Sequence, residues 1–186
     1  STNDLKIKKY CEKNGFKIDY LRPKSLSESS SNVADAILHG AKWLKKNKNI
    51  KVDAILLLQP TSPLRYSNEI KNAIRLFKKN KLISMVSVSP IKEHPHASVE
   101  ILKKDKWKFL KTPGKNIYRR QQFSNNFYYI DGNFYLIKLN FLKKNKSFIK
   151  KKITNFFKLK RGWPVDIDNY EDLAVASALL KMKKND

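Results

Sequence analysis

Two apolar runs without polar alternation constrain the fold of this chain more than any other feature. They cover Val52–Leu58 and Leu82–Val88, and each follows a segment whose apolar residues repeat at helical spacing. Such a run is typical of a strand that is buried on both faces of a parallel sheet. The order helix, strand, helix, strand in the first half of the chain therefore predicts an α/β fold with right-handed crossovers.

Turn and cap residues predict the remaining elements. The N-terminal part is expected to hold a helix over Asp4–Asn14 that Gly15 ends, a short strand over Phe16–Leu21, a helix capped by Ser31 or Asn32, and a helix that begins at Ser67. Beyond Pro90 the patterns predict an antiparallel hairpin (Val99–Lys103 and Trp107–Lys111), strands at Phe127–Ile137 (broken near Gly132) and Phe156–Leu159, and a last helix at Tyr170–Lys183.

The charge is strongly basic, with a formal net charge of +24 in 186 residues. Lysines supply most of it and are spread over the helices and turns, and there is no arginine-rich tract, zinc-finger spacing or aromatic RNA-binding signature. This pattern indicates solvated lysine-rich faces, so nucleic acid is not the expected partner. Cys11 is the single cysteine, the longest apolar run is too short for a membrane, and no signal-peptide pattern opens the chain. A cytoplasmic protein is expected.

The loop Gln59–Arg65 follows the first apolar strand and combines rigidity with polarity. Two prolines fix its backbone, while Gln59, Thr61 and Ser62 offer donors and acceptors and Arg65 adds a charge. Ligands of such sheets lie at the carboxyl ends of the strands. The loop is either a recognition element for a base or sugar or a proline-stiffened turn before a helix cap.

The stretch Val165–Asp168 alternates apolar and acidic residues. If it is extended, Asp166 and Asp168 lie on one face, where two hard oxygen ligands suit Mg²⁺ with substrate phosphates completing the shell. The alternative is that Asp168 only caps the last helix.

Arg119-Arg120-Gln121 holds the paired arginines of the chain, and it is either a carboxylate-binding site or a solvated basic turn. The histidines His39, His94 and His96 are not at metal spacing, which argues against a zinc site.

Taken in order, these pieces resemble the acylneuraminate cytidylyltransferases, also called CMP-sialic acid synthetases. The matching stretches are Leu21-Arg22-Pro23, Leu57–Arg65 (LLQPTSPLR), Ser84–Val88, Arg120-Gln121, Asp131–Tyr135 (DGNFY) and Val165–Asp168 (VDID). The opening Ser1–Asp4 resembles the end of the family's second strand, so the resemblance covers nearly the whole chain.

The resemblance implies a Rossmann-like nucleotidyltransferase sheet, mostly parallel, with a small antiparallel dimerisation arm. It implies one domain over residues 1–186, an arm within residues 94–132 that also serves the sugar site, and a homodimer. The implied reaction joins CTP and a nonulosonic acid into a CMP-sugar and pyrophosphate.

The resemblance also implies roles for individual residues. Asp166 and Asp168 would hold Mg²⁺, and Arg22 would contact the cytosine. The nucleotide–sugar pocket would be lined by Gln59, Thr61 and Ser62, the sugar carboxylate would face Arg120 and Gln121, and the sugar would face Tyr135.

Three departures from the family pattern stand out. Asp131-Gly132-Asn133 replaces the usual Asn-Gly-Ala, and Ala97 replaces a lysine that some members carry. The family's first strand and Gly-rich phosphate loop have no counterpart in these 186 residues, which predicts that they alone do not form a CMP-sugar at a useful rate.

Two other hypotheses remain on this fold. One is a nucleotidyltransferase for another sugar or nucleotide, and the other is a non-catalytic basic binding module. The presence of Arg120, Asp166 and Asp168 favours an enzyme.

Overall fold

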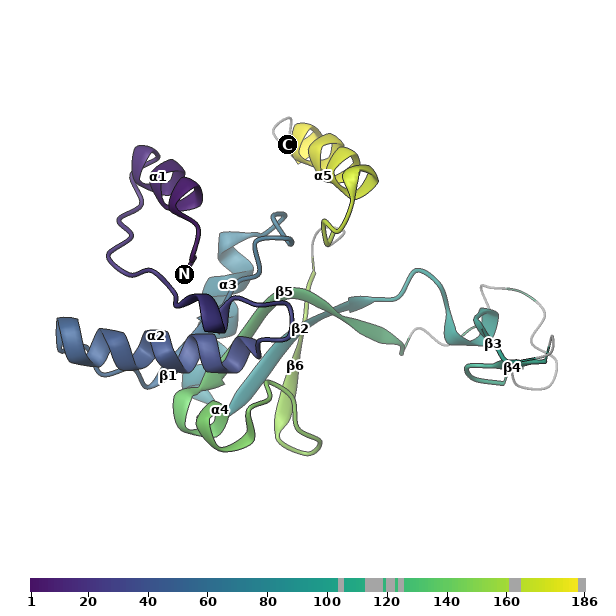
Figure 1. Cartoon of the computed structure of the whole chain (residues 1–186). Coiled ribbons are helices and arrows are strands. Elements are labelled where there is room, and N and C mark those ends of the chain that lie inside the picture. The colour runs from purple at the N-terminus through teal and green to yellow at the C-terminus, as the bar shows by residue number, and fades with distance from the viewer. Residues whose placement is uncertain (104–105, 113–118, 120–122, 124–125, 161–164, 184–186) are drawn as a thin grey trace. The chain divides into compact units, whose positions relative to one another are not determined.

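The computed structural model describes residues 1–103, 106–112, 119, 123, 126–160 and 165–183, which fall into two compact units (Figure 1). Unit 1 comprises Ser1–Leu57, Asn72–Val86 and Tyr135–Asn155, and unit 2 comprises Leu58–Lys71, Ser87–Phe134 and Phe156–Asp186. Each unit draws on three separate stretches of chain. The single domain expected over residues 1–186 stays a prediction.

Side-chain caps fix the helix starts in unit 1. The Asp4 carboxylate accepts hydrogen bonds from the backbone N–H groups of Lys6 and Ile7 and opens α1 (Leu5–Lys13). The Asn32 side chain accepts from the Ala34 N–H and opens α2 (Val33–Lys48), which decides between the two predicted caps. Gly15 follows α1 with a φ of +83°, as the predicted helix stop requires.

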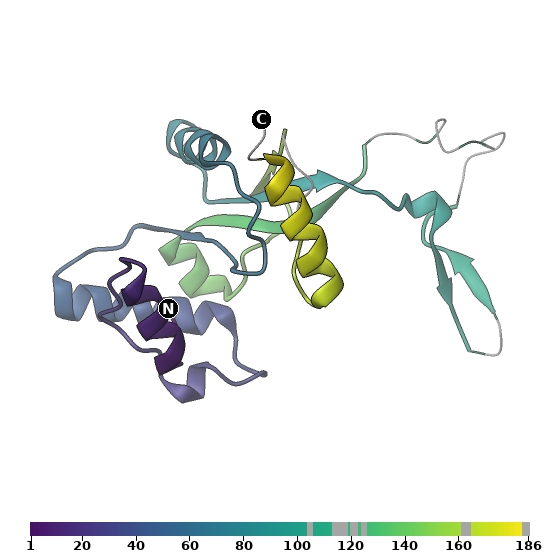
Figure 2. The same cartoon turned by 90° about the horizontal axis from the view of Figure 1, so that it is seen from above.

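The core of unit 1 lies between α2, α4 (Leu139–Asn145) and the sheet. Its fully buried members are Ala34, Ile137 and Leu142, and Ile55 and Phe148 pack against them. Helices α2 and α4 lie side by side in Figures 1 and 2. The sequence patterns did not predict α4, because its seven residues are too short for a clear apolar repeat.

The main sheet has the strand order β1-β5-β2-β6, with β1 at Ala54–Leu57, β5 at Tyr128–Lys138, β2 at Ser84–Pro90 and β6 at Thr154–Lys158. Strand β1 pairs antiparallel with β5, and Ala54 lies opposite Lys138. The strand predicted at Val52–Leu58 was expected to be parallel and buried on both faces. The first expectation is wrong because β1 pairs antiparallel with β5, and the second is wrong because no residue of β1 is fully buried. An apolar run favours a parallel, doubly buried strand but does not fix its direction, which depends on the segment with which it pairs.

Two further strand predictions need correction. The strand expected at Phe16–Leu21 is reduced to one parallel bridge between Thr2 and Leu21. Strand β5 runs continuously through Gly132, where a break was expected, although this glycine adopts a φ of +69°. A single left-handed residue bends the strand there without ending its pairing.

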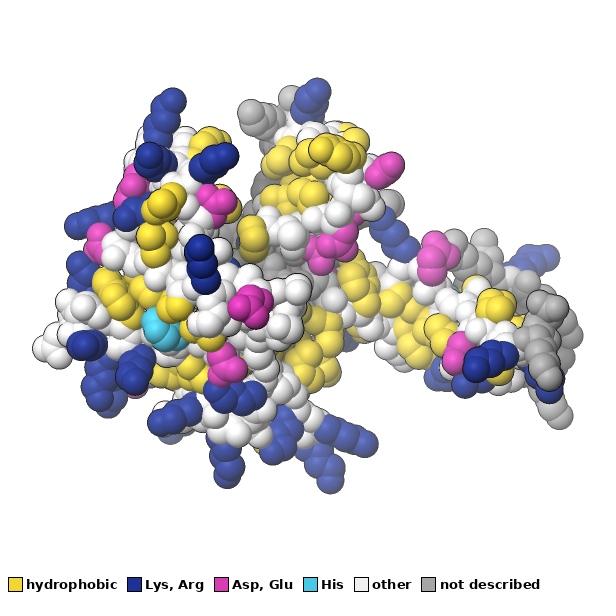
Figure 3. All heavy atoms as spheres, viewed as in Figure 1, with side chains coloured by type: hydrophobic (Ala, Val, Ile, Leu, Met, Phe, Trp, Pro, Cys, Tyr) yellow, Lys and Arg dark blue, Asp and Glu magenta, His cyan; other side chains and the backbone are white. Residues whose placement is uncertain are grey.

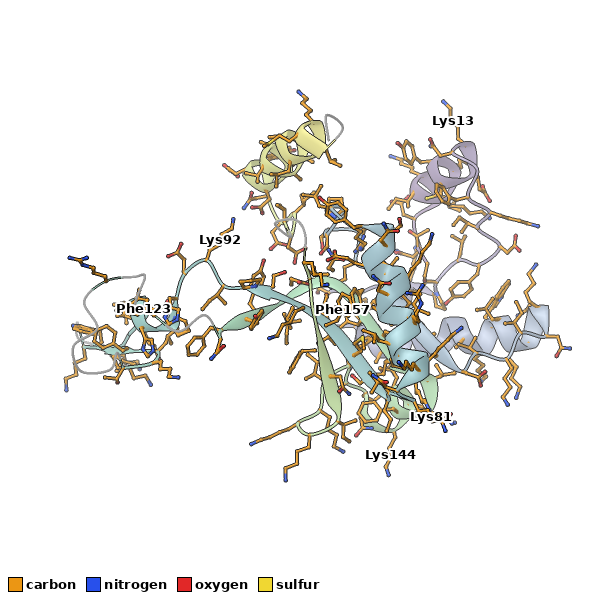
Figure 4. All side chains as sticks on the ribbon, turned by 180° about the vertical axis from the view of Figure 1, so that it is seen from behind. Lys13, Lys81, Lys92, Phe123, Lys144 and Phe157 are labelled. Atoms are coloured by element: carbon orange, nitrogen blue, oxygen red, sulfur yellow. The ribbon has the colours of Figure 1, made fainter. Side chains whose placement is uncertain are left out.

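Unit 2 contains a core built around α5 (Tyr170–Lys183), a helix with the predicted bounds. Leu64, Val165 and Ala176 are buried there, with Ile167 and Leu179 packed beside them. Phe134 and Phe157 are also ring neighbours in this unit, with centroids 5.6 Å apart (Phe157 is labelled in Figure 4).

The predicted hairpin of unit 2 is confirmed. Strands β3 (Val99–Ile101) and β4 (Trp107–Phe109) pair antiparallel after a short 3-10 turn at Pro95–Ala97, as Figure 2 shows. The remaining elements are α3 (Ser67–Lys79) and a second 3-10 turn at Lys24–Leu26.

Lysine and arginine side chains project from the visible surface in Figure 3 and do not form one continuous patch there. None of the helices within the described ranges is both long and apolar enough to cross a membrane.

Candidate functional site

The loop after β1 is a closed, stiff turn. The Ser62 N–H donates to the Gln59 carbonyl at 3.2 Å, and the Arg65 N–H donates to the Pro63 carbonyl at 3.0 Å. Ser62 is fully buried within it. Because Pro60 and Pro63 restrict the backbone further, the loop presents its side chains at little entropic cost on binding.

The acidic stretch lies directly against this loop. The Ile167 N–H donates to the Thr61 carbonyl at 2.8 Å, and the side chains of Val165 and Ile167 pack into the α5 core. In an extended stretch, alternate side chains point to opposite faces. Asp166 and Asp168, both exposed, therefore lie on the face away from the core.

Gly132 brings side chains from both segments together. A β-carbon placed on it would lie 2.7 Å from Gln59 Oε1, 3.2 Å from Ser62 Oγ and 3.8 Å from Asp166 Oδ2. Two oxygen atoms of the loop and one of the acidic stretch thus converge on one point. The absence of a side chain at position 132 is what leaves room for them.

The hydroxyl of Ser62 is the most informative of these groups. It is buried and, among the residues that the structure describes, it has no hydrogen-bond partner. A buried polar atom without a partner costs about 1–3 kcal/mol, so its presence needs an explanation. A bound ligand that offers a donor or acceptor would supply one.

Asp131 precedes Gly132 and has a buried, hydrogen-bonded carboxylate. It accepts hydrogen bonds from Ser87 Oγ, from Ser89 Oγ at 2.7 Å and from the Asn133 N–H at 3.0 Å. Both serines belong to β2. The sequence patterns missed this cluster, although serines inside an otherwise apolar strand were a usable signal, since buried hydroxyls need partners.

Arg65 is held by backbone carbonyl groups. Its Nε donates to the Asn133 carbonyl at 2.8 Å, and its Nη2 donates to the Gln59 carbonyl. Burial lowers the pKa of its guanidinium. The charge expected to serve recognition therefore stabilises the loop itself.

Comparison with known proteins supports the resemblance read from the motifs. A curated relative, the CMP-N,N'-diacetyllegionaminic acid synthase of Legionella pneumophila, is 32% identical over 95 residues, which cover 51% of this chain and 40% of the relative. The chain thus matches less than half the length of that relative. No protein-family model matches. The resemblance to the CMP-sugar cytidylyltransferases is confirmed.

Solved structures of nucleotidyltransferases share the fold. The CMP:2-keto-3-deoxy-manno-octonic acid synthetase complexed with CTP has a TM-score of 0.65 at 12% identity, covering 97% of this chain and 79% of that one. The 4-diphosphocytidyl-2C-methyl-D-erythritol synthase of Anaerococcus prevotii has a TM-score of 0.59 at 16% identity, covering 94% and 75%. The predicted α/β fold class is therefore confirmed, with a mixed sheet.

The alternative that Asp168 only caps the last helix is not what the structure shows. The Asp172 carboxylate accepts from the N–H groups of Asp168 and Asn169, and Asn169 Oδ1 accepts from the Asp172 N–H. This reciprocal pair is a capping box. Asn169 and Asp172, and not the carboxylate of Asp168, therefore cap α5.

The carboxylates of the site affect the pKa of Tyr129. Burial raises the pKa of its phenol, and the negative charges of Asp131 and Asp166 raise it further. The phenol therefore stays protonated and able to donate at neutral pH.

Four other residues were expected from the cytidylyltransferase resemblance. Arg22 and Tyr135 belong to unit 1, where Arg22 Nε donates to Ser27 Oγ at 2.9 Å and the Tyr135 ring lies 5.3 Å from that of Phe148. Arg120 and Gln121 lie outside the described residues. The roles of all predicted site residues stay predictions.

The histidines contact aromatic or hydroxyl groups. His39 Nδ1 lies 2.7 Å from the Tyr20 hydroxyl, and His94 stacks on His96 and on Phe123, which Figure 4 labels. Within the described ranges, no group of three or more His, Cys, Asp or Glu side chains is arranged to hold a metal ion.

Proposed function

We propose that this chain takes part in the transfer of a cytidylyl group from CTP to a nonulosonic acid. The anomeric hydroxyl oxygen of the sugar acid forms a bond to the α-phosphorus of CTP, and the bond to the leaving pyrophosphate breaks. The hydroxyl proton passes to solvent. Positioning and charge neutralisation supply most of the rate enhancement in such a transfer.

One observation carries this proposal. Gln59 Oε1, Ser62 Oγ and Asp166 Oδ2 converge around Gly132, and together with this glycine they belong to three of the six stretches that carry the resemblance. Coincidence of three separate motifs at one point is expected of a site and not of a scaffold. The unpartnered Ser62 hydroxyl supports a ligand there, and sugar hydroxyls are suitable partners.

The carboxylates of the Val165–Asp168 stretch suit a hard divalent cation. Asp166 and Asp168 offer exposed carboxylates, and Mg²⁺ in nucleotide sites is usually held by one or two carboxylates plus substrate phosphates. We assign these two residues to the cation. When bound, Mg²⁺ would neutralise charge on the triphosphate, while Gln59 and Ser62 orient the sugar acid.

Calorimetry on the 186-residue chain tests the substrates. Binding is the readout, because it reports each substrate separately. The chain should bind CTP in preference to UTP, ATP and GTP, and it should bind a sialic-type acid in preference to its carboxamide. Equal affinity for all four nucleotides, or for acid and amide, would overturn the proposal.

Arg120→Ala tests the carboxylate contact. Loss of a charge-assisted contact should weaken sugar-acid binding by about tenfold or more and leave CTP binding unchanged. The control is Arg75→Ala, whose exposed side chain bonds only to Asn72 within the described residues. Equal losses for both substrates would remove Arg120 from the sugar site.

Titration with Mn²⁺ or Mg²⁺ alone tests the metal assignment. Asp166→Asn and Asp168→Asn should each abolish the binding isotherm, whereas Asp35→Asn should retain it, because Asp35 pairs with Lys146 in unit 1. Retention by all three variants would show that the cation binds elsewhere or not specifically.

We also propose a homodimer formed through the arm at residues 94–132, in the cytoplasm. The β3–β4 hairpin leaves Ile101 72% and Trp107 55% exposed, a large apolar area for a free surface. Trp107→Glu should yield monomers in sedimentation velocity, whereas Phe16→Glu, which changes an exposed ring of unit 1, should not. A monomeric unmodified chain would contradict the dimer.

A further inference from the structure

Asp131 is a buried carboxylate that the proposed chemistry does not use. Its residue is 4% exposed, and three uncharged donors hold it: two serine hydroxyls of β2 and the Asn133 N–H. A buried carboxylate is costly unless it is fully hydrogen-bonded. Such an arrangement is retained where it fixes a geometry, and the geometry here is the turn at Gly132.

The first consequence concerns the side chain of Gln59. Because Oδ1 and Oδ2 of Asp131 are bonded to separate partners, the backbone on either side of Gly132 is restrained. Gly132 adopts its φ of +69° between Asp131 and Asn133, and its α-carbon faces Gln59 Oε1. A shift of this turn would therefore move the Gly132 backbone that Gln59 Oε1 approaches.

The second consequence concerns the main chain of Gln59. The N–H of Asn133 donates to Asp131, and the carbonyl of Asn133 accepts from Arg65 Nε. The same guanidinium donates through Nη2 to the Gln59 carbonyl. A continuous series of hydrogen bonds therefore runs from Asp131 to the backbone of Gln59.

We propose that Asp131 is the positioning residue of this site, which sets Gln59 through both the Gly132 turn and the Asn133–Arg65 hydrogen bonds. It touches no reacting atom. The identity of the ligand rests on the proposed function, whereas the network that Asp131 organises does not.

The alternative is that Asp131 serves stability alone. Ser84 provides the matched comparison, because it lies on the same strand as Ser87 and is equally buried. Its hydroxyl donates to the Phe148 carbonyl at 2.6 Å and lies 3.1 Å from Thr154 Oγ1, all within unit 1. Ser84→Ala should therefore lower stability without altering the Gln59 loop.

The first measurement needs no ligand. In ¹⁵N NMR of the 186-residue chain, the exchange rates of the Arg65 Nε–H and the Ser62 backbone N–H report the loop. Asp131→Ala should raise both rates by about tenfold or more, because it removes the anchor of the series. Asp131→Asn should restore most of the protection, since its carbonyl oxygen still accepts from Ser87 and Asn133. Ser84→Ala should change neither rate.

The second measurement separates positioning from stability. Sugar-acid affinity should fall by about tenfold in Asp131→Ala, recover in Asp131→Asn and stay unchanged in Ser84→Ala at a matched loss of melting temperature. Ser89→Ala, which removes one donor, should give a smaller change in the same direction. The Ser89→Ala variant tests the inference by itself if Asp131→Ala does not fold.

The outcomes are distinguishable. Unchanged Arg65 Nε–H exchange in the Asp131 and Ser89 variants would overturn the inference whatever the chain binds. Faster exchange with unchanged sugar-acid affinity would assign Asp131 a purely structural role. If the unmodified chain binds no sugar acid, the proposed function fails, and the exchange rates alone decide whether Asp131 sets the loop.

Discussion

Gly15 and Gly132 have similar left-handed backbones, with φ values of +83° and +69°, but their surroundings are opposite. A β-carbon on Gly15 would meet no atom within 4 Å, whereas one on Gly132 would meet three side-chain oxygens. The first glycine meets a local need, the end of a helix. The second also meets a tertiary need, the close approach of the Gln59 loop. Backbone conformation alone therefore does not show which glycine belongs to a site.

The largest expected effect separates these two glycines. Ala at either position pays the strain of a positive φ, about 1–3 kcal/mol. Gly132→Ala should cost a further 1–3 kcal/mol or so through crowding against Gln59 and Ser62, and it should abolish sugar-acid binding. Chemical denaturation and calorimetry of Gly132→Ala and Gly15→Ala measure both terms. Equal losses of stability and unchanged binding would remove the distinction between the two sites.

Arg65→Lys tests the hydrogen bonds that Arg65 makes beside Gly132, and its expected effect on stability is intermediate. A lysine cannot donate to the Asn133 and Gln59 carbonyls in the same fork geometry, so stability should fall by about 1.5–3 kcal/mol. Arg75→Lys, on the exposed face of α3, should stay within about 0.5 kcal/mol. A similar small change for both variants in urea denaturation would show that the fork contributes little.

Ser62→Ala should change stability in the opposite direction. Removing a buried hydroxyl that lacks a partner should stabilise the free chain by about 1 kcal/mol while weakening sugar-acid binding. Ser84→Ala, which removes a bonded hydroxyl, should destabilise the chain. Thermal melts give both signs, and a destabilised Ser62→Ala variant would indicate an internal partner for that hydroxyl.

The smallest expected effect concerns the ionisation of Tyr129. Asp166→Asn removes one of the charges that raise the pKa of its phenol, so this pKa should fall toward the ordinary value but stay above it, since burial is the largest cause. A raised folded pKa contributes stability that is present below the unfolded pKa and is lost as pH rises through the folded one. The variant should therefore lose this contribution at a lower alkaline pH. Carbon-13 NMR of the tyrosine ring measures the shift, and an unchanged pKa would place Asp166 farther from Tyr129.

Local patterns predicted much of the fold. The end of α1 at Gly15, the cap of α2, the hairpin and the bounds of α5 all follow from side chains that act within a few residues. The direction of β1 and the loss of the strand at Phe16–Leu21 depend on which distant segments pair, and a single sequence contains no direct record of that.

The site was predictable in part for the same reason. The motifs indicated Gln59, Ser62 and Asp166 as separate candidates, and the structure brings them together around Gly132. The role of Arg65 as a loop clamp and the burial of Asp131 beneath the turn arise only in three dimensions. Residues that fix other residues leave a weaker trace in sequence than residues that bind ligands.

The hydrogen bonds of Asp131 have a consequence for how the site responds to salt. Its partners are hydroxyl and amide donors inside the protein, so added salt has no ion pair to screen there. The exposed pair of Lys48 and Asp19, by contrast, weakens as the screening length falls to about 3 Å at 1 M salt. The frame of the site should thus be unchanged across a salt titration. Any loss of ligand affinity in that titration would then report the charge of the ligand.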